Sequence, residues 1–438
     1  MNRLLFIGNG FDIAHNKCTK YMDFLYACAK LTNNNFDYTI PKDYEEKLKY
    51  TTTLFISTYK HDDDFIKDIS NNIWINYFYT CSKENWVDFE NEIKSLCDTK
   101  SFYEHCSHED QLNFYNEYQE KYKRPIFKSD NFDFIDIDTL TKHLNQLIEI
   151  LNKYLLIVDQ MDSNCYSPNV LWFAPTNVIS FNYTNTFKNI YFKDMDENNY
   201  IDFIHGRIDE NKNNIVLGFN RMNDDNYTVE YSDFLKIYQR VNKNVEIHNF
   251  NRFSYNVDTK SYSTKHTYSM FFGHSLDITD ENIIKEAIRI SYKVYILYYD
   301  EKHKASMIKN LLKMYSRDEF EDLCLSYNHK IVFIKQQPMC KVLDSNIINN
   351  YFKNIKFEAD EGLIDYIKSK EFEDLNLSSE NYAYLYNKLC RTYKSNEDEA
   401  NRKSIGEYLY NKYEENLDKD RYVDETIEHE RREGEYYE

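Results

Sequence analysis

The chain has 438 residues, of which 42% are hydrophobic and 17% aromatic, so it can bury a large core and has room for two or three domains. A formal net charge of -19 at pH 7 disfavours duplex nucleic acid as a partner, and no apolar run approaches the ~18 residues of a membrane span. The nine cysteines never form a C-x-x-C pair, which argues against a disulfide framework and a zinc ribbon. We therefore expect a soluble, cytoplasmic protein of enzyme size.

Short apolar runs rich in β-branched and aromatic residues recur along the chain and predict β-strands. Helical patterns follow two of these runs, at Ile284, Ala287 and Ile288 and at Ile308 and Leu311. Continuous apolar strands that alternate with helices are typical of a mostly parallel sheet covered on both faces. The sequence therefore predicts an α/β, Rossmann-like fold, with strands at residues 4–7, 178–181, 200–204, 215–217, 268–272, 293–298 and 330–334.

The interval between the first two predicted strands is helical. It spans about 170 residues, which is too long for one crossover connection, and Leu140, Leu144, Leu147 and Leu151 recur within it at helical spacing. We therefore predict a discontinuous α/β domain at residues 1–40 and 166–345, interrupted by a helical insertion at 41–165. A polar excursion at about 222–266 is a candidate lid, and residues 346–438 are predicted to form a C-terminal helical region with an acidic tail.

Glycine is scarce, with 8 in the whole chain, yet Gly8 and Gly10 directly follow the first predicted strand. Either these glycines form a plain tight turn, or they let backbone N–H groups at the start of a helix approach phosphate oxygens. Ligands of open parallel sheets bind outside the carboxyl ends of the strands. One site is therefore predicted from the residues that end the later strands, which are Asn182, His205, Gly206, Gly218, Gly273, His274 and Ser275.

Several short motifs occur in a fixed order over about residues 1–300. They are Gly8-Asn9-Gly10-Phe11-Asp12 with His15, Thr19-Lys20-Tyr21, Trp86-Val87-Asp88-Phe89-Glu90, Phe181-Asn182-Tyr183-Thr184, His205-Gly206, and Gly273-His274-Ser275-Leu276 with Asp280. This series resembles the AbiH family of phage abortive-infection proteins, whose core is similar to the sirtuin-like NAD-binding domain. The resemblance implies an antiphage effector with a sirtuin-like α/β core and NAD as its substrate.

The resemblance also implies roles for individual residues. Asn182 matches the Asn beside the nicotinamide ribose, His205 matches the catalytic His, and Glu90 is favoured to face the cleft. Thr184 stands where many sirtuin-like proteins have Asp, and the absent zinc-binding cysteine quartet disfavours protein deacetylation. No metal is expected, and the implied NAD-binding residues are Gly8, Asn9, Gly10, Phe11, Asp12, His15, Gly206, Gly273, His274, Ser275 and Asp280.

The chemistry expected of this site is the cleavage of the bond between ribose and nicotinamide. That reaction develops oxocarbenium character and needs an oriented water and a base. His205 suits the base because an unperturbed histidine titrates near neutral pH, while Asn182 can orient the water or the ribose hydroxyls. The neutral nicotinamide needs little acid assistance as a leaving group.

Plainer interpretations stand beside these roles. His205 is alternatively a strand-end histidine, Asn182, Ser275 and Asp280 are alternatively helix caps, and His15 and His274 more often have structural roles. Three functions therefore stay open: an NAD-cleaving effector, a nucleotide-binding sensor without turnover, and a toxin that acts on other nucleotides or nucleic acid. A phage-derived trigger and a homo-oligomer are further expectations.

Overall fold

The computed structural model describes residues 2–341 apart from 43, 83–86, 106–135, 162, 164, 174, 192–200, 212–213, 224–228, 246–249, 252–266, 327–328 and 337–338. The chain divides into two compact units, one made of Met1–Ser163 and Thr176–Lys335 and the other of Asn164–Pro175 and Gln336–Glu438. The C-terminal helical region predicted at 346–438 lies outside the described residues. All residues of the site considered below belong to the first unit.

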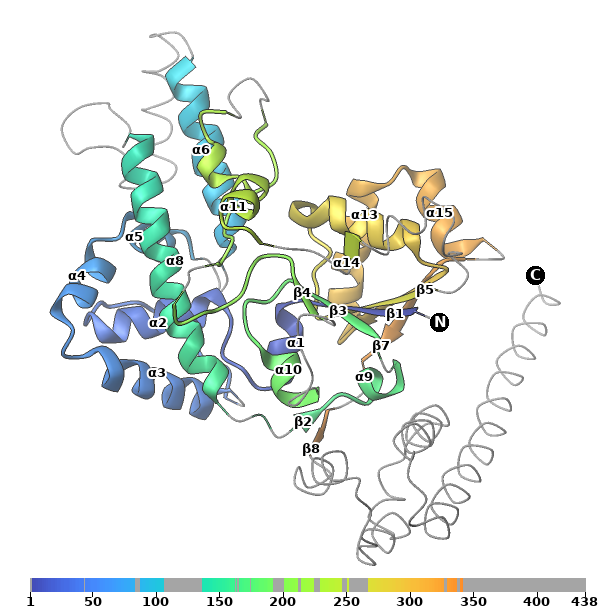
Figure 1. The fold of residues 1–438 in the computed structure, drawn as a ribbon, viewed down its shortest axis with the longest axis horizontal. Helices are drawn as coiled ribbons and strands as arrows, with labels where there is room; N and C mark the ends of the chain where they lie inside the picture. The colour runs from blue at the N-terminus through green and yellow to red at the C-terminus, as the bar shows by residue number, and fades with distance from the viewer. Residues whose placement is uncertain are drawn as a thin grey trace, which may run out of the picture. The chain divides into compact units, whose positions relative to one another are not determined.

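The first unit contains a six-stranded sheet in which all neighbouring strands are parallel (Figure 1). Its strand order is β4-β3-β1-β5-β6-β7, which is the doubly wound order of dinucleotide-binding folds. The order reverses between β1 and β5, and such a reversal leaves a crevice at the carboxyl ends of the strands. The predicted α/β fold with a mostly parallel sheet is confirmed, with strands β1 (Asn2–Ile7), β3 (Asn177–Ser180), β4 (Ile201–Phe203), β5 (Thr267–Phe272), β6 (Lys293–Tyr298) and β7 (Ile331–Lys335).

The central strand β1 is apolar because both faces of the sheet are covered. Leu4, Leu5 and Phe6 are fully buried, and the ring of Phe6 stacks on that of Phe271 in β5. Part of the cover comes from the predicted helices, in which Ile284, Ala287 and Leu311 are buried. The helices next to the strands are α1 (Asn9–Ala14), α10 (Thr186–Tyr191), α13 (Glu281–Ile290), α14 (Glu301–Met314) and α15 (Arg317–Leu325).

The helices of the predicted insertion lie beyond the carboxyl ends of the strands (Figure 1). Their core contains the leucine stripe predicted from the sequence, together with Trp74, whose indole N–H donates to Leu140 O at 2.9 Å. Helix α2 and the buried Phe234 belong to the same core. The insertion helices are α3 (Glu45–Tyr59), α4 (Asp63–Asn71), α5 (Ile73–Cys81), α6 (Phe89–His105) and α8 (Ile137–Gln160), and α2 (Tyr21–Leu31) precedes them in the chain.

The strand predicted at residues 215–217 does not form, and this prediction was wrong. A side chain takes the place of a neighbouring strand: the N–H of Leu217 donates to Gln239 Oε1 at 3.0 Å, and Gln239 Nε2 donates to Leu217 O at 2.8 Å. The segment is nevertheless buried, which explains its apolar sequence. It is followed by η3 (Ser232–Phe234) and α11 (Lys236–Asn242), and η5 (Ile278–Asp280) follows β5.

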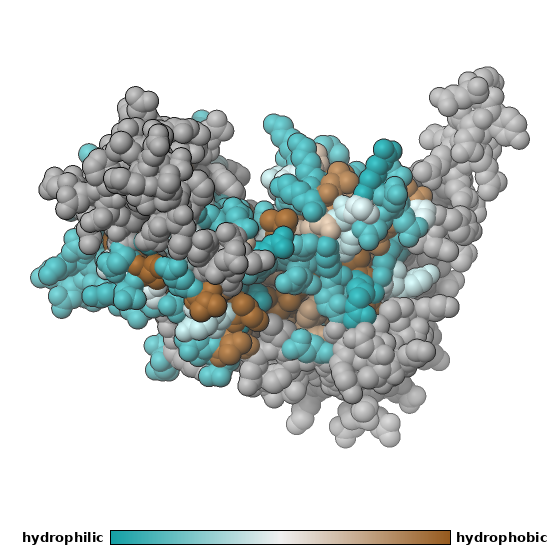
Figure 2. All heavy atoms as spheres, turned by 90° about the horizontal axis from the view of Figure 1, so that it is seen from above, coloured by the Kyte–Doolittle hydropathy of each residue, from teal (hydrophilic) through white to brown (hydrophobic). Residues whose placement is uncertain are grey.

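The described part of the second unit contains one antiparallel pair, β2 (Cys165–Tyr166) with β8 (Cys340–Lys341), and helix α9 (Pro168–Phe173). In the described part of the chain no helix is long and apolar enough to cross a membrane. Among the described residues visible in Figure 2, hydrophilic side chains predominate and hydrophobic patches lie between them.

Candidate functional site

The carboxyl ends of β1 and β5 are held together where the strand order reverses. The N–H of Gly8 donates to Phe272 O at 3.0 Å, and the N–H of Gly10 donates to Gly273 O at 2.8 Å. A Cβ on Gly10 would lie 2.7 Å from Gly273 Cα, so a larger residue would push the two turns apart. These glycines therefore have a packing role, and the N–H of Gly10 already has an acceptor within the protein.

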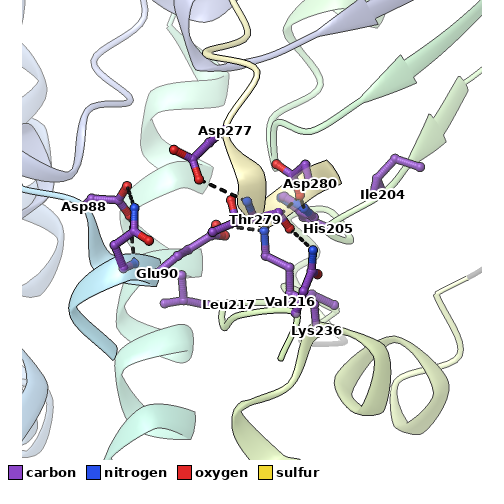
Figure 3. A network of polar contacts seen from close by, with 12 residues as sticks. Asp88, Glu90, Ile204, His205, Val216, Leu217, Lys236, Asp277, Thr279 and Asp280 are labelled. Atoms are coloured by element: carbon purple, nitrogen blue, oxygen red, sulfur yellow. Dashed lines mark hydrogen bonds and ion pairs between the residues drawn. The ribbon is translucent and has the colours of Figure 1, made fainter. Parts of the chain in front are cut away.

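A buried polar cluster is centred on Asp280 (Figure 3). Its Oδ1 lies 3.0 Å from His205 Nε2 and 3.0 Å from Lys236 Nζ, and its Oδ2 lies 3.5 Å from His274 Nε2. The four side chains are at most 8% exposed. His205 follows β4, and His274 and Asp280 follow β5. The parallel sheet thus brings together three residues that the sequence predicted to share one site.

The cluster continues from Asp280 through Lys236 to Glu90. Lys236 Nζ lies 2.7 Å from Glu90 Oε2, and the two side chains are 0% and 12% exposed. Glu90 lies in the first turn of α6, whereas Lys236 begins α11. Lys236 therefore joins the helical insertion to the carboxyl edge of the sheet.

The two carboxylates of the cluster differ in acidity. Burial raises the pKa of Glu90 to about 7, although the positive charge of Lys236 partly opposes the shift. Burial would also raise the pKa of Asp280, but the charges and hydrogen bonds of Lys236 and His205 outweigh it and hold that pKa well below its usual value. Asp280 is therefore the ionised partner of the cluster at neutral pH, while Glu90 is close to its titration point.

His205 has the arrangement of a general base. Burial, together with the charge of Lys236, lowers the pKa of His205 to about 4, so the ring is neutral at pH 7. In the neutral tautomer that this contact favours, Nε2–H donates to Asp280 and Nδ1 carries the lone pair. Among the described residues none hydrogen-bonds to Nδ1. A carboxylate that orients the imidazole and a second nitrogen without a partner among the described residues are the geometric features of base catalysis by histidine, but the lowered pKa makes this ring a weaker base than the near-neutral histidine expected from the sequence.

Asn182 lies beside the glycine turn at the end of β3. Its Nδ2 donates to Gly8 O at 2.9 Å, and within the described chain its Oδ1 has no hydrogen-bond partner. The preceding residue, Phe181, places its ring between two histidines, with centroid distances of 5.5 Å to His205 and 4.1 Å to His274. Asn182 is thus near the cluster and offers an amide oxygen, and its side chain does not cap the following helix.

Asp12 is enclosed in the core behind the glycine turn. Its Oδ2 accepts a hydrogen bond from Thr184 Oγ1 at 2.5 Å, and its Oδ1 has no partner among the described residues. Burial raises the pKa of Asp12 to about 6. The hydroxyl of Thr184, which stands where many sirtuin-like proteins have Asp, thus donates to the carboxylate of Asp12.

His15 and Phe11 pack beneath the sheet. His15 is fully buried, its Nδ1 lies 2.7 Å from Phe11 O, and its Nε2 lies 2.9 Å from the hydroxyl of Tyr191. Burial lowers the pKa of His15 to about 4, so the ring is neutral. Both ring nitrogens already have protein partners, which is the environment of a structural histidine.

The remaining predicted residues lie at turns around the cluster. Asn9 and Ser275 are exposed, and Asn9 Oδ1 accepts from Thr19 Oγ1 at 2.5 Å. Gly206 has a φ of +71°, and a Cβ there would lie 1.7 Å from Asn214 O. The turn after β5 is held by His274, whose Nδ1 accepts the N–H of Leu276 at 2.9 Å.

Lys236 was missed by reasoning from the sequence. It lies in the polar excursion predicted at about residues 222–266, and nothing in the neighbouring sequence indicates that its ammonium group is buried. For Glu90 the signal was the Val87-Asp88-Phe89-Glu90 motif, and the structure pairs its carboxylate with the buried Lys236. In the described part of the chain no cluster of His, Cys, Asp and Glu side chains fits a metal ion.

Comparison with known proteins adds one finding. The family model described as "Bacteriophage abortive infection AbiH" matches residues 4–299, which is more than half of the chain. No curated protein and no solved structure matches the chain. The matched range contains the sheet strands up to β6, the helical insertion and all members of the polar cluster.

Proposed function

Because the chain belongs to the AbiH family of bacteriophage abortive-infection proteins, we propose that it is an antiphage effector that hydrolyses NAD at the bond between nicotinamide and ribose. The observation that carries the proposal is the pair formed by His205 and Asp280 at the carboxyl edge of a doubly wound sheet. Sheets of this order bind dinucleotides at that edge. The proposal includes a sirtuin-like core, a phage-derived trigger and self-association.

In the proposed reaction, water attacks C1′ of the nicotinamide ribose as the C1′–N bond breaks. The bonding electron pair moves to the pyridinium nitrogen, so nicotinamide leaves as a neutral molecule. The proton of the attacking water passes to Nδ1 of His205, and Asp280 stabilises the imidazolium that forms. The free Oδ1 of Asn182 orients the water or a ribose hydroxyl.

The test is incubation of the purified protein with NAD, NADP and ATP, with products separated by chromatography. We expect release of nicotinamide from NAD by the wild type. His205→Ala should keep NAD affinity and lose turnover by about 10²–10⁴-fold, which is the usual contribution of a general base. Asn182→Ala should lower turnover with a smaller effect on affinity. The matched control is His61→Ala, because His61 is an exposed histidine in the helical insertion.

The cellular consequence is also measurable. Cells that express the wild type together with its trigger should lose NAD, and cells that express His205→Ala should not. If NAD stays level while toxicity persists, hydrolysis is refuted. A nucleotide sensor without turnover, or a toxin that acts on other nucleotides or nucleic acid, then takes its place.

A further inference from the structure

Helix α11 has the reverse of the usual amphipathic pattern. Its apolar residues Ile237, Tyr238 and Val241 are 59%, 41% and 71% exposed, whereas Lys236 and Gln239 are buried. An ordinary surface helix buries its apolar stripe and exposes its charges. The inward face of α11 therefore serves polar contacts at the carboxyl edge of the sheet.

Three basic residues share this inward face, because positions 236, 240 and 243 are spaced by four and three residues. Lys236 is neutralised by Glu90 and Asp280. Lys243 Nζ donates to Ile215 O at 2.5 Å. Such a row of basic groups is unexpected in a chain with a net charge of -19.

Arg240 has more unused donors than the two lysines. Its Nε donates to Ile204 O at 2.9 Å, one residue before His205. Within the described residues its two terminal nitrogens have no acceptor, and no carboxylate pairs with it. The side chain is half-buried, and burial lowers the pKa of its guanidinium although the charges of Asp280 and Glu90 act in the opposite direction. Neither carboxylate forms an ion pair with Arg240, so within the described chain its terminal N–H groups are left without the hydrogen bonds that a buried charge needs. Its charge is close enough to His205 to help lower the pKa of that ring.

We propose that Arg240 binds the diphosphate of the nucleotide substrate. A guanidinium presents parallel N–H donors that match two phosphate oxygens, and a charge-assisted pair of this kind is stronger than a neutral hydrogen bond. The bond from Nε to Ile204 O fixes the orientation of the group beside His205. Lys236 is committed to two carboxylates, so Arg240 is the cation of α11 that remains for an anionic ligand. This inference rests on the proposed function, because it concerns the same site.

The experiment measures binding and not turnover. Titration calorimetry compares ADP-ribose, which has a diphosphate and no nicotinamide, with adenosine, which has no phosphate. We expect Arg240→Gln to weaken ADP-ribose binding by at least about tenfold, the usual worth of a hydrogen bond to a charged group. Arg240→Lys keeps the charge but loses the two parallel N–H donors of the guanidinium, so its affinity for ADP-ribose should be intermediate. Arg317→Gln is the matched control, since Arg317 is 85% exposed on α15.

The outcomes separate this inference from the proposed function. Loss of ADP-ribose binding in Arg240→Gln, with an unchanged melting temperature, supports the role of Arg240 even if NAD is never hydrolysed. Equal binding by Arg240→Gln and the wild type overturns it, as does a wild type that binds no ADP-ribose. Binding of a short single-stranded oligonucleotide in place of ADP-ribose also overturns the assignment to a dinucleotide.

Discussion

Replacing Lys236 by methionine should strongly destabilise the first unit. Met has a similar length, so the change removes the ammonium group while largely preserving volume. Two carboxylates, Glu90 and Asp280, lose the cation that lies 2.7 Å and 3.0 Å from them. Breaking a buried ion pair by removal of one partner costs about 3–5 kcal/mol, and Lys236 is fully buried. Asp280 keeps its contacts with His205 and His274 but loses the cation that contributes most to holding its pKa low, so we expect both carboxylates to contribute to the loss.

The loss should depend on pH in a defined direction. The pKa of Glu90 is raised from its ordinary value of 4.5 to about 7 in the folded protein. The stability that its protonated form contributes is therefore fully present below about pH 4.5 and is lost as pH rises through 7. Without Lys236, which lowers that pKa, the titration moves to still higher pH. The destabilisation should therefore be larger at pH 8 than at pH 5.5. Glu90→Gln combined with Lys236→Met should recover part of the loss at pH 8.

Urea unfolding followed by tryptophan fluorescence measures these effects, because Trp74 is buried in the helical core. The matched control is Lys49→Met, since the ion pair between Lys49 and Glu45 is on the surface and its lysine is 61% exposed. That variant should leave the urea midpoint unchanged. If Lys236→Met behaves like Lys49→Met, or if its effect is the same at pH 5.5 and pH 8, the reasoning from a buried ion-pair cluster is refuted.

Two further predictions concern the glycine turns and the core behind them. Asp12→Asn should stabilise the protein by about 1–2 kcal/mol at pH 8. Burial raises the pKa of Asp12 from 3.8 to about 6, and each pKa unit corresponds to about 1.4 kcal/mol of unfolding free energy. The cost of an unpaired amide group in the variant is subtracted from that gain. In the wild type, the stability contributed by protonated Asp12 is lost as pH rises from about 4 to 6. The gain in urea midpoint of Asp12→Asn over the wild type should therefore vanish near pH 4. A variant that is no more stable than the wild type at pH 8 would contradict this prediction. Gly206→Ala should cost at least about 2 kcal/mol by the same assay, since its φ of +71° and the approach of Asn214 O exclude a Cβ; a midpoint within error of the wild type would show that this turn relaxes freely.

Much of the sheet was predictable from the sequence because it depends on local pattern. The run Leu4–Phe6 is apolar at every position, which is typical of a strand buried on both faces, and the helical spacing of Leu140, Leu144 and Leu147 corresponds to the buried face of α8. Polar residues at the strand ends also met as expected, because parallel strands present their carboxyl ends at one edge. His205, after β4, and His274, after β5, both contact Asp280.

The segment at residues 215–217 shows where local pattern is insufficient. Its three apolar residues have the composition of a strand, but the backbone of Leu217 is bonded by the side chain of Gln239 and not by a neighbouring strand. Burial explains the composition, and whether a neighbouring strand or an amide side chain supplies the hydrogen bonds depends on the position of α11. The hydrophobic periodicity of the sequence does not indicate where α11 lies relative to this segment.

The sequence by itself determined the fold class, the glycine turns at the end of the first strand and the residue types at the strand ends. Only the tertiary structure decided which charged side chains form ion pairs at the strand ends. Lys236 lies between Glu90 and Asp280, which come from distant parts of the chain, and Arg240 faces the same edge with donors unused by the described residues. A lysine or arginine in a polar segment is ordinarily solvated. These two are buried or half-buried because α11 turns its basic face inward, and that orientation follows from packing between segments that no local pattern connects.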